Sequence, residues 1–190
     1  MIELSEEYTE CILVSYPTVL EKQAKFLAVF GVVTLFVAVG ALHGIEFLRD
    51  NLVLFLLTFL VVGGMTILGH ESIHGIVYVL LGYEIDWGKA DRLNAFYAGA
   101  FDQVVSRKES MLALSAPLLS LNLIFLPLFF APIPLLVFSA FAVLVVNTSM
   151  SRADLYAISR VYNAPSGSIV YHTNPEEFRI CTPDSKEFEL

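Results

Sequence analysis

The sequence predicts an all-α integral membrane protein with four transmembrane helices and small cytoplasmic strand or loop additions. Two observations support this fold class. The 190 residues are 56% hydrophobic with a mean hydropathy of +0.70, which is more apolar than a soluble domain of this length usually is. The apolar residues also fall into separate windows, each close to the ~20 residues that cross ~30 Å of hydrocarbon as a helix. A single membrane domain covering residues 1–190 is therefore expected.

The windows predict four spans, at about 24–42, 52–81, 111–131 and 133–156. The second runs for thirty residues without proline, so as a helix it is longer than the hydrocarbon alone requires. The fourth is short as an apolar run, but NTSMSRADLYAISRV follows it without glycine or proline and is expected to extend the same helix. Acidic residues precede the first span, which is the wrong leader for a cleaved signal peptide.

The remaining segments are polar. Residues 83–110 are a predicted loop with aromatic residues among charges, typical of an amphipathic loop or hairpin at a membrane surface. Residues 157–190 are a predicted tail, in which APSGSIVYHTNPEEFRI has the pattern turn, strand, turn, strand. A strand or interfacial segment is expected at residues 11–16, because Pro17 interrupts any helix there.

Lysine and arginine predict the orientation, because cytoplasmic loops carry the excess of these residues. Ten of the eleven lie before the first span, between the second and third, or after the fourth, and only Arg49 lies in an outer loop. A multi-pass protein with both termini in the cytoplasm is expected. Cys11 and Cys181 would then face a reducing compartment, so a disulfide is not expected. The net charge of −8 argues against a nucleic-acid partner, since no basic stripe is present.

The segment ILGHESIHGIVYVLLG places ionisable residues inside the second span. Such groups cost roughly 2.5 to 3.5 kcal/mol within a bilayer, so they are expected to have partners or a task. His70 and His74 are four residues apart and can bind one ion from one helix face. With Glu71 they form the HExxH arrangement, in which two imidazoles bind Zn²⁺ and the glutamate takes a proton from water. The motif predicts a zinc site with Glu71 as the catalytic base.

A catalytic zinc needs a third protein ligand and an open position for water. Counted from the start of each span, Asp154 lies at the same depth in the fourth span as the two histidines in the second. Asn147, Ser151 and Asp154 follow i, i+4, i+7 spacing, so they share one face of a continuous helix. Asp154 is the predicted third ligand, and Asn147 and Ser151 are expected to orient a ligand or the substrate.

Other polar residues have simpler interpretations. His172, in a strand-like tail, is a weaker candidate for the third ligand, and His43 is interfacial at the opposite membrane face. Glu84 and Asp86 are expected to be solvated loop charges, and Asn122 is expected to make a hydrogen bond between helices. The motif also has a simpler alternative, in which the histidine pair only hydrogen-bonds within the bundle and the aspartate is an interfacial carboxylate.

The motif HESIH near the cytoplasmic end of a predicted transmembrane helix, followed two spans later by an aspartate, resembles the site-2-protease group of intramembrane zinc metalloproteases. The order HESIHGIVY, NAFYAGAF, LALSAP and NTSMSRADLY more closely resembles a small putative zincin peptidase family of unknown function related to that group. The resemblance covers most of the chain from Gly69 to about Glu177. It implies zinc held by His70, His74 and Asp154, Glu71 as general base, and peptide-bond hydrolysis at the membrane.

The predicted function is a membrane-embedded zinc metalloprotease that hydrolyses peptide bonds of membrane or membrane-associated proteins near the cytoplasmic leaflet. Its partners would be the lipid bilayer and a membrane-protein or peptide substrate. An alternative is a catalytically silent membrane scaffold or regulator that retains the fold. A haem protein is disfavoured, because His70 and His74 share one helix face and His43 lies across the bilayer.

Overall fold

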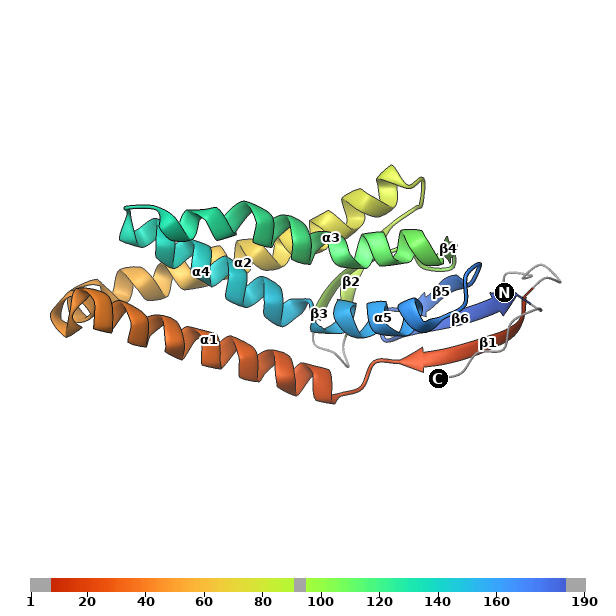
Figure 1. Cartoon of the computed structure of the whole chain (residues 1–190), viewed down its shortest axis with the longest axis horizontal. Helices are drawn as coiled ribbons and strands as arrows, with labels where there is room; N and C mark the ends of the chain where they lie inside the picture. The colour runs from red at the N-terminus through yellow and green to blue at the C-terminus, as the bar shows by residue number, and fades with distance from the viewer. Residues whose placement is uncertain (1–7, 91–94, 184–190) are drawn as a thin grey trace. The chain divides into compact units, whose positions relative to one another are not determined.

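The computed structural model describes residues 8–90 and 95–183. The elements follow in the order β1 (Tyr8–Ser15), α1 (Val19–His43), α2 (Ile45–Leu80), β2 (Asp86–Ala90), β3 (Ala95–Gly99), β4 (Val104–Ser106), α3 (Arg107–Phe125), the 3₁₀ helix η1 (Leu126–Phe130), α4 (Pro134–Met150), α5 (Arg152–Asn163), β5 (Ile169–Asn174) and β6 (Glu177–Pro183) (Figure 1). The chain divides into two compact units. Of the described residues, the first comprises 8–18, 71–90, 95–116 and 153–183, and the second comprises 19–70 and 117–152.

Long apolar helices dominate the chain, as the composition predicts. Within the part of the chain that the structure describes, three segments are long and apolar enough to cross a membrane: Val19–Ala41, Ile45–Leu80 and Arg107–Phe130. The pair α4 and α5 passes the same test as one span bent by 47°. The expectation of a mostly helical chain with small strand additions is confirmed in this form: the described residues are mostly helical, and three or four of their helices could span a membrane by length and composition.

The sequence suggested one continuous helix for the fourth predicted span. The structure has two helices there. Helix α4 ends at Met150, and α5 begins at Arg152. Both the backbone N–H and the hydroxyl of Ser151 donate to the Asn147 carbonyl, at 2.9 Å each. A serine hydroxyl that bonds back to a carbonyl four residues earlier commonly bends a helix. Asp154 was predicted by counting residues along one straight helix, but the helix is interrupted at Ser151.

The first unit contains the six strands that the described residues form. Four form an antiparallel sheet in the order β1-β6-β5-β4, and β2 and β3 form a separate hairpin. These strands confirm the expected strand near residue 11, the hairpin within residues 83–110 and the strand pair in the tail. A buried cluster of Tyr78, Ala100, Val105 and Ala113 joins the strand segments to the helix turns in this unit.

Cys11 and Cys181 form a disulfide, contrary to the sequence-based expectation. Antiparallel pairing places Cys11 of β1 directly opposite Cys181 of β6, with Cα atoms 4.1 Å apart. Residues that face each other in an antiparallel ladder are within reach of such a bond. The prediction of free thiols was wrong because it relied on the assumed compartment, whereas strand register decides which side chains meet.

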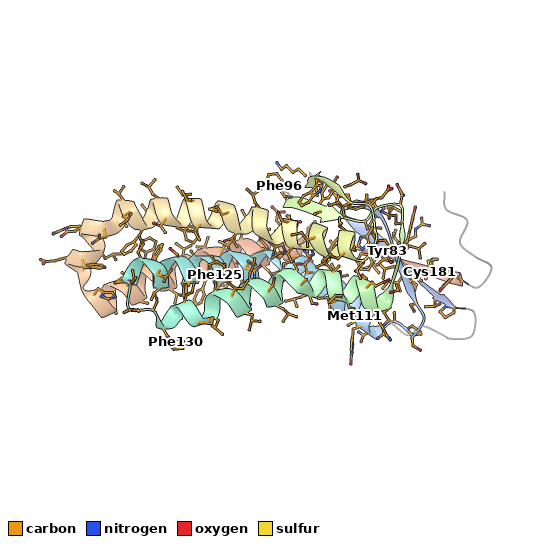
Figure 2. All side chains as sticks on the ribbon, turned by 90° about the horizontal axis from the view of Figure 1, so that it is seen from above. Tyr83, Phe96, Met111, Phe125, Phe130 and Cys181 are labelled. Carbon is orange, nitrogen blue, oxygen red and sulfur yellow. A yellow bond between two sulfur atoms is a disulfide. The ribbon has the colours of Figure 1, made fainter. Side chains whose placement is uncertain are left out.

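The second unit is a helical bundle held by close packing and aromatic contacts. Helices α1 and α4 lie side by side (Figure 1), and a Cβ built on Gly31 of α1 would lie 2.5 Å from Val145 of α4, so a larger residue does not fit there. The Phe55 and Phe138 rings stack with centroids 4.6 Å apart in a buried cluster. Large apolar side chains cover the outer helix surfaces, and Phe130, labelled in Figure 2, is 87% exposed. Such a surface suits lipid better than water.

His172 of β5 is an ionisable group inside the first unit. Its ring stacks on Phe178 at 5.3 Å and meets the edge of Phe101 at 6.2 Å. Its Nε2 atom is buried and has no hydrogen-bond partner among the described residues. Burial therefore lowers the pKa of His172 from 6.5 to about 4.

Acid is expected to destabilise this unit through His172. Since the folded-state pKa is below the unfolded value, the unfolded chain binds the proton first, and stability falls as the pH drops from about 6.5 to about 4. The full loss amounts to about 3 kcal/mol at 1.36 kcal/mol per pKa unit. Chemical unfolding of the first unit as a function of pH measures it. His172→Phe should remove this fall in the free energy of unfolding with decreasing pH. His43→Gln, a change at an exposed position, should retain it. An equal pH dependence in the wild type and both variants would contradict the prediction.

Candidate metal centre

The HExxH motif lies in an unbroken stretch of α2, as its spacing requires. His70, Glu71 and His74 are 2%, 9% and 5% exposed, so all three lie inside the protein although they are polar. Because α2 is continuous here, His70 and His74 lie about one helical turn apart on the same face of the helix. Buried polar groups need partners, and each of the two imidazoles has one on Nδ1.

Asn147 of α4 holds His70. The His70 Nδ1 atom lies 2.8 Å from the Asn147 side-chain oxygen. The Asn147 amide nitrogen donates to the Pro117 carbonyl at 3.3 Å and to the Asn122 side-chain oxygen at 3.1 Å, which fixes which way the amide points. The oxygen of Asn147 must then accept, so Nδ1 of His70 carries the proton. In this tautomer, Nε2 is the His70 nitrogen that can act as a metal ligand.

His74 is held in the same tautomer by the backbone of α3. Its Nδ1 atom lies 2.9 Å from the carbonyl oxygen of Ala113, and a carbonyl can only accept. Nδ1 therefore carries the proton. Its Nε2 atom lies 3.4 Å from Oδ1 of Asp154, the carboxylate expected to complete the site. Both residues are largely buried, with side chains 7% and 14% exposed.

The three residues form one donor group. One ligand atom from each of His70, His74 and Asp154 lies within 4.8 Å of the other two. Two neutral imidazoles and one carboxylate are a donor set typical of catalytic zinc sites, where a fourth position stays open for water or substrate. Hydrogen bonds on the far nitrogen of each imidazole are also what zinc-binding histidines usually have. The residues present therefore fit a zinc ion.

Glu71 faces the hairpin. Its Oε2 atom accepts a hydrogen bond from the backbone N–H of Ala98 in β3 at 3.0 Å. The hairpin also packs on the next turn of α2, where a Cβ on Gly75 would lie 2.7 Å from the Trp87 ring. Gly75 thus lets β2 approach the helix one residue after His74. The carboxylate is held beside an edge of β3 that has no strand partner among the described residues.

The remaining candidates lie outside the donor group. Ser151 is buried and supports the Asn147 carbonyl, so it acts on the backbone near Asn147. His172 packs between aromatic rings and is not part of the donor group. His43 is exposed next to Phe47, and Glu84 and Asp86 are exposed. Asn122 makes the predicted hydrogen bond between helices.

Two partners in the centre were not predicted from the sequence. The Ala98 N–H and the Ala113 carbonyl are backbone groups, and every residue other than proline carries both. No residue type marks them. Their one signal is indirect: Pro117 follows Ala113 by four residues in the same helix.

Comparison with known proteins adds a family to this geometry. Residues 62–169 match the family described as "Putative zincin peptidase", a stretch that includes His70, Glu71, His74, Asn147 and Asp154. No curated protein and no solved structure matches the chain. The match covers more than half of the 190 residues. The chain therefore belongs to the putative zincin peptidase family.

Proposed function

We propose that this protein is a membrane-embedded zinc metalloprotease that hydrolyses peptide bonds of membrane or membrane-associated proteins near the cytoplasmic leaflet. The observation that carries the proposal is the donor group of His70, His74 and Asp154 beside the carboxylate of Glu71. A relation to site-2 proteases is part of the proposal, supported by the position of HESIH in a helix long and apolar enough to span a membrane.

In the proposed hydrolysis, the zinc ion and the protein side chains would have different roles. When bound, zinc would act as a Lewis acid and lower the pKa of water toward ~7. His70, His74 and Asp154 would hold it, with the Nδ1–H of each imidazole donated to an oxygen so that Nε2 is the ligand atom. Glu71 would accept the proton of the attacking water on its carboxylate and deliver it to the leaving amine nitrogen.

Strand β3 offers a place for the substrate backbone. The Ala98 N–H points away from β2, because it donates to Glu71. An extended peptide that adds to this edge would lie next to the general base, and backbone pairing of this kind tolerates many side-chain sequences. A helical substrate would have to open before it could bind in this way.

We also propose that the protein crosses the membrane several times with both termini in the cytoplasm. The excess of lysine and arginine in the segments assigned to that side supports this orientation. This orientation requires the Cys11–Cys181 disulfide to persist in the cytoplasm, where protein disulfides are rare, so the redox state of the two cysteines in intact cells tests it.

Metal removal tests the proposed function. The purified protein in detergent is expected to bind one zinc ion per chain and to cleave members of a mixed peptide library, with products identified by mass spectrometry. A chelator should abolish cleavage and added zinc should restore it, because the metal supplies the Lewis acid. Bound zinc without cleavage would favour the silent scaffold, and absence of bound zinc would overturn the proposed metal site.

A further inference from the structure

Pro117 lies inside helix α3, where proline is unusual. A proline in a helix interior has no N–H to donate, and its ring pushes against the carbonyl four residues earlier. In α3 that carbonyl belongs to Ala113. The Ala113 carbonyl therefore has no intrahelical donor at position 117. Its oxygen accepts the hydrogen bond from His74 Nδ1 at 2.9 Å.

Pro117 also contributes to the support of His70. Its own carbonyl accepts a hydrogen bond from the Asn147 amide nitrogen at 3.3 Å. That bond helps to orient Asn147, whose side-chain oxygen lies 2.8 Å from His70 Nδ1. The proline ring is fully buried, with less than 2% of its surface exposed. One residue is thus linked to the partners of both histidines.

We propose that Pro117 is a positioning residue for the two histidines of the metal centre. By withholding an N–H, it reserves the Ala113 carbonyl for the Nδ1–H of His74, so that the Nε2 atom is the one that belongs to the donor group. The Pro117 carbonyl also accepts a hydrogen bond from the Asn147 amide nitrogen. This bond orients the Asn147 side-chain oxygen, which accepts the Nδ1 proton of His70. The inference rests on the proposed zinc site, and it accounts for a residue that otherwise only weakens α3.

The alternative is that Pro117 only shapes the helix. A membrane helix tolerates proline where neighbouring groups satisfy the freed carbonyl, and here the satisfying group is a histidine of the metal centre. A purely structural role predicts that any variant which folds normally binds zinc normally. A positioning role predicts that zinc affinity changes although the fold is intact.

The substitution Pro117→Ala tests the difference. Alanine supplies an N–H at position 117 that competes with His74 for the Ala113 carbonyl. Loss of an orienting partner typically weakens metal binding by 10- to 100-fold, so a decrease of that order in zinc affinity is expected. Competition with a chelator of known affinity measures it. In the zinc-bound protein labelled with ¹⁵N-histidine, the Nδ1–H proton resonance of His74 should move upfield in Pro117→Ala, because that proton shares the Ala113 carbonyl with a second donor.

Two further variants control the experiment. Pro134→Ala makes the same change at the first residue of α4, where a backbone N–H has no intrahelical acceptor, so zinc affinity should not change. Pro117→Gly restores the N–H without the methyl group and should weaken zinc binding in the same way. Zinc affinity of folded Pro117→Ala and Pro117→Gly within twofold of wild type would overturn the inference. Failure of the wild-type protein to bind zinc would instead overturn the metal site itself.

Discussion

Replacing Glu71 with glutamine is expected to abolish peptide hydrolysis and to leave one zinc ion bound per chain. Glutamine has the shape of glutamate and retains an oxygen that can accept the hydrogen bond from Ala98 N–H, so the local packing is preserved. It cannot take a proton from water. General-base catalysis typically contributes 10²- to 10⁴-fold, so cleavage should fall by about that factor or below detection. Single-turnover cleavage of a peptide identified from the library, together with metal analysis of the same sample, measures both quantities.

The control for Glu71→Gln is Glu84→Gln. Glu84 is an exposed acid in the same unit, and its loss should change neither zinc content nor cleavage. Undiminished cleavage by Glu71→Gln would refute the role of Glu71 as general base. Loss of zinc together with activity would show that Glu71 acts on the metal site rather than on water.

Removing a ligand is expected to empty the metal site. His74→Ala leaves two of the three donors and also leaves the Ala113 carbonyl without its imidazole partner. Asp154→Ala removes the only acidic donor of the group and with it the charge that compensates Zn²⁺. Each loss should exceed the 10- to 100-fold that an orienting partner contributes, so zinc should not survive dialysis against a weak chelator. Elemental analysis after dialysis provides the measurement.

Asp86→Ala serves as the matched control, because Asp86 is an exposed acid in β2 outside the donor group. It should retain one zinc ion per chain. Full zinc occupancy in Asp154→Ala would show that another residue supplies the third ligand. His172 was the other sequence-based candidate, yet its ring packs against Phe101 and Phe178 in the first unit.

The part of the centre that sequence predicts well is the part set by a single helix. His70, Glu71 and His74 fall on neighbouring helix positions by spacing alone, and no distant contact is needed to place them. Asp154 was selected by counting along a helix that the chain breaks at Ser151, and it nevertheless lies beside His74. An acidic residue at about the right depth was enough to identify Asp154, although the helix is not continuous as assumed.

The parts that sequence does not predict depend on pairing between distant segments. The hydrogen bonds of Ala98 and Ala113 use backbone groups, so no side chain signals them. The Cys11–Cys181 bond follows from the register of β1 with β6, whereas the compartment argument suggested free thiols. The strand pattern of the tail was visible, but the order β1-β6-β5-β4 requires knowing which edges meet.

The pairing of β1 with β6 also constrains how the molecule is made. The two cysteines are separated by 170 positions, so β1 leaves the ribosome long before its partner strand exists. Until then the N-terminal segment has neither its ladder nor its covalent bond, and the entropy of closing so long a loop opposes early pairing. The apolar helices between them, whose hydrogen bonds are local, can form during synthesis. We therefore expect the sheet to be completed last, with the protein remaining open at that end to chaperones and proteases until translation has passed β6.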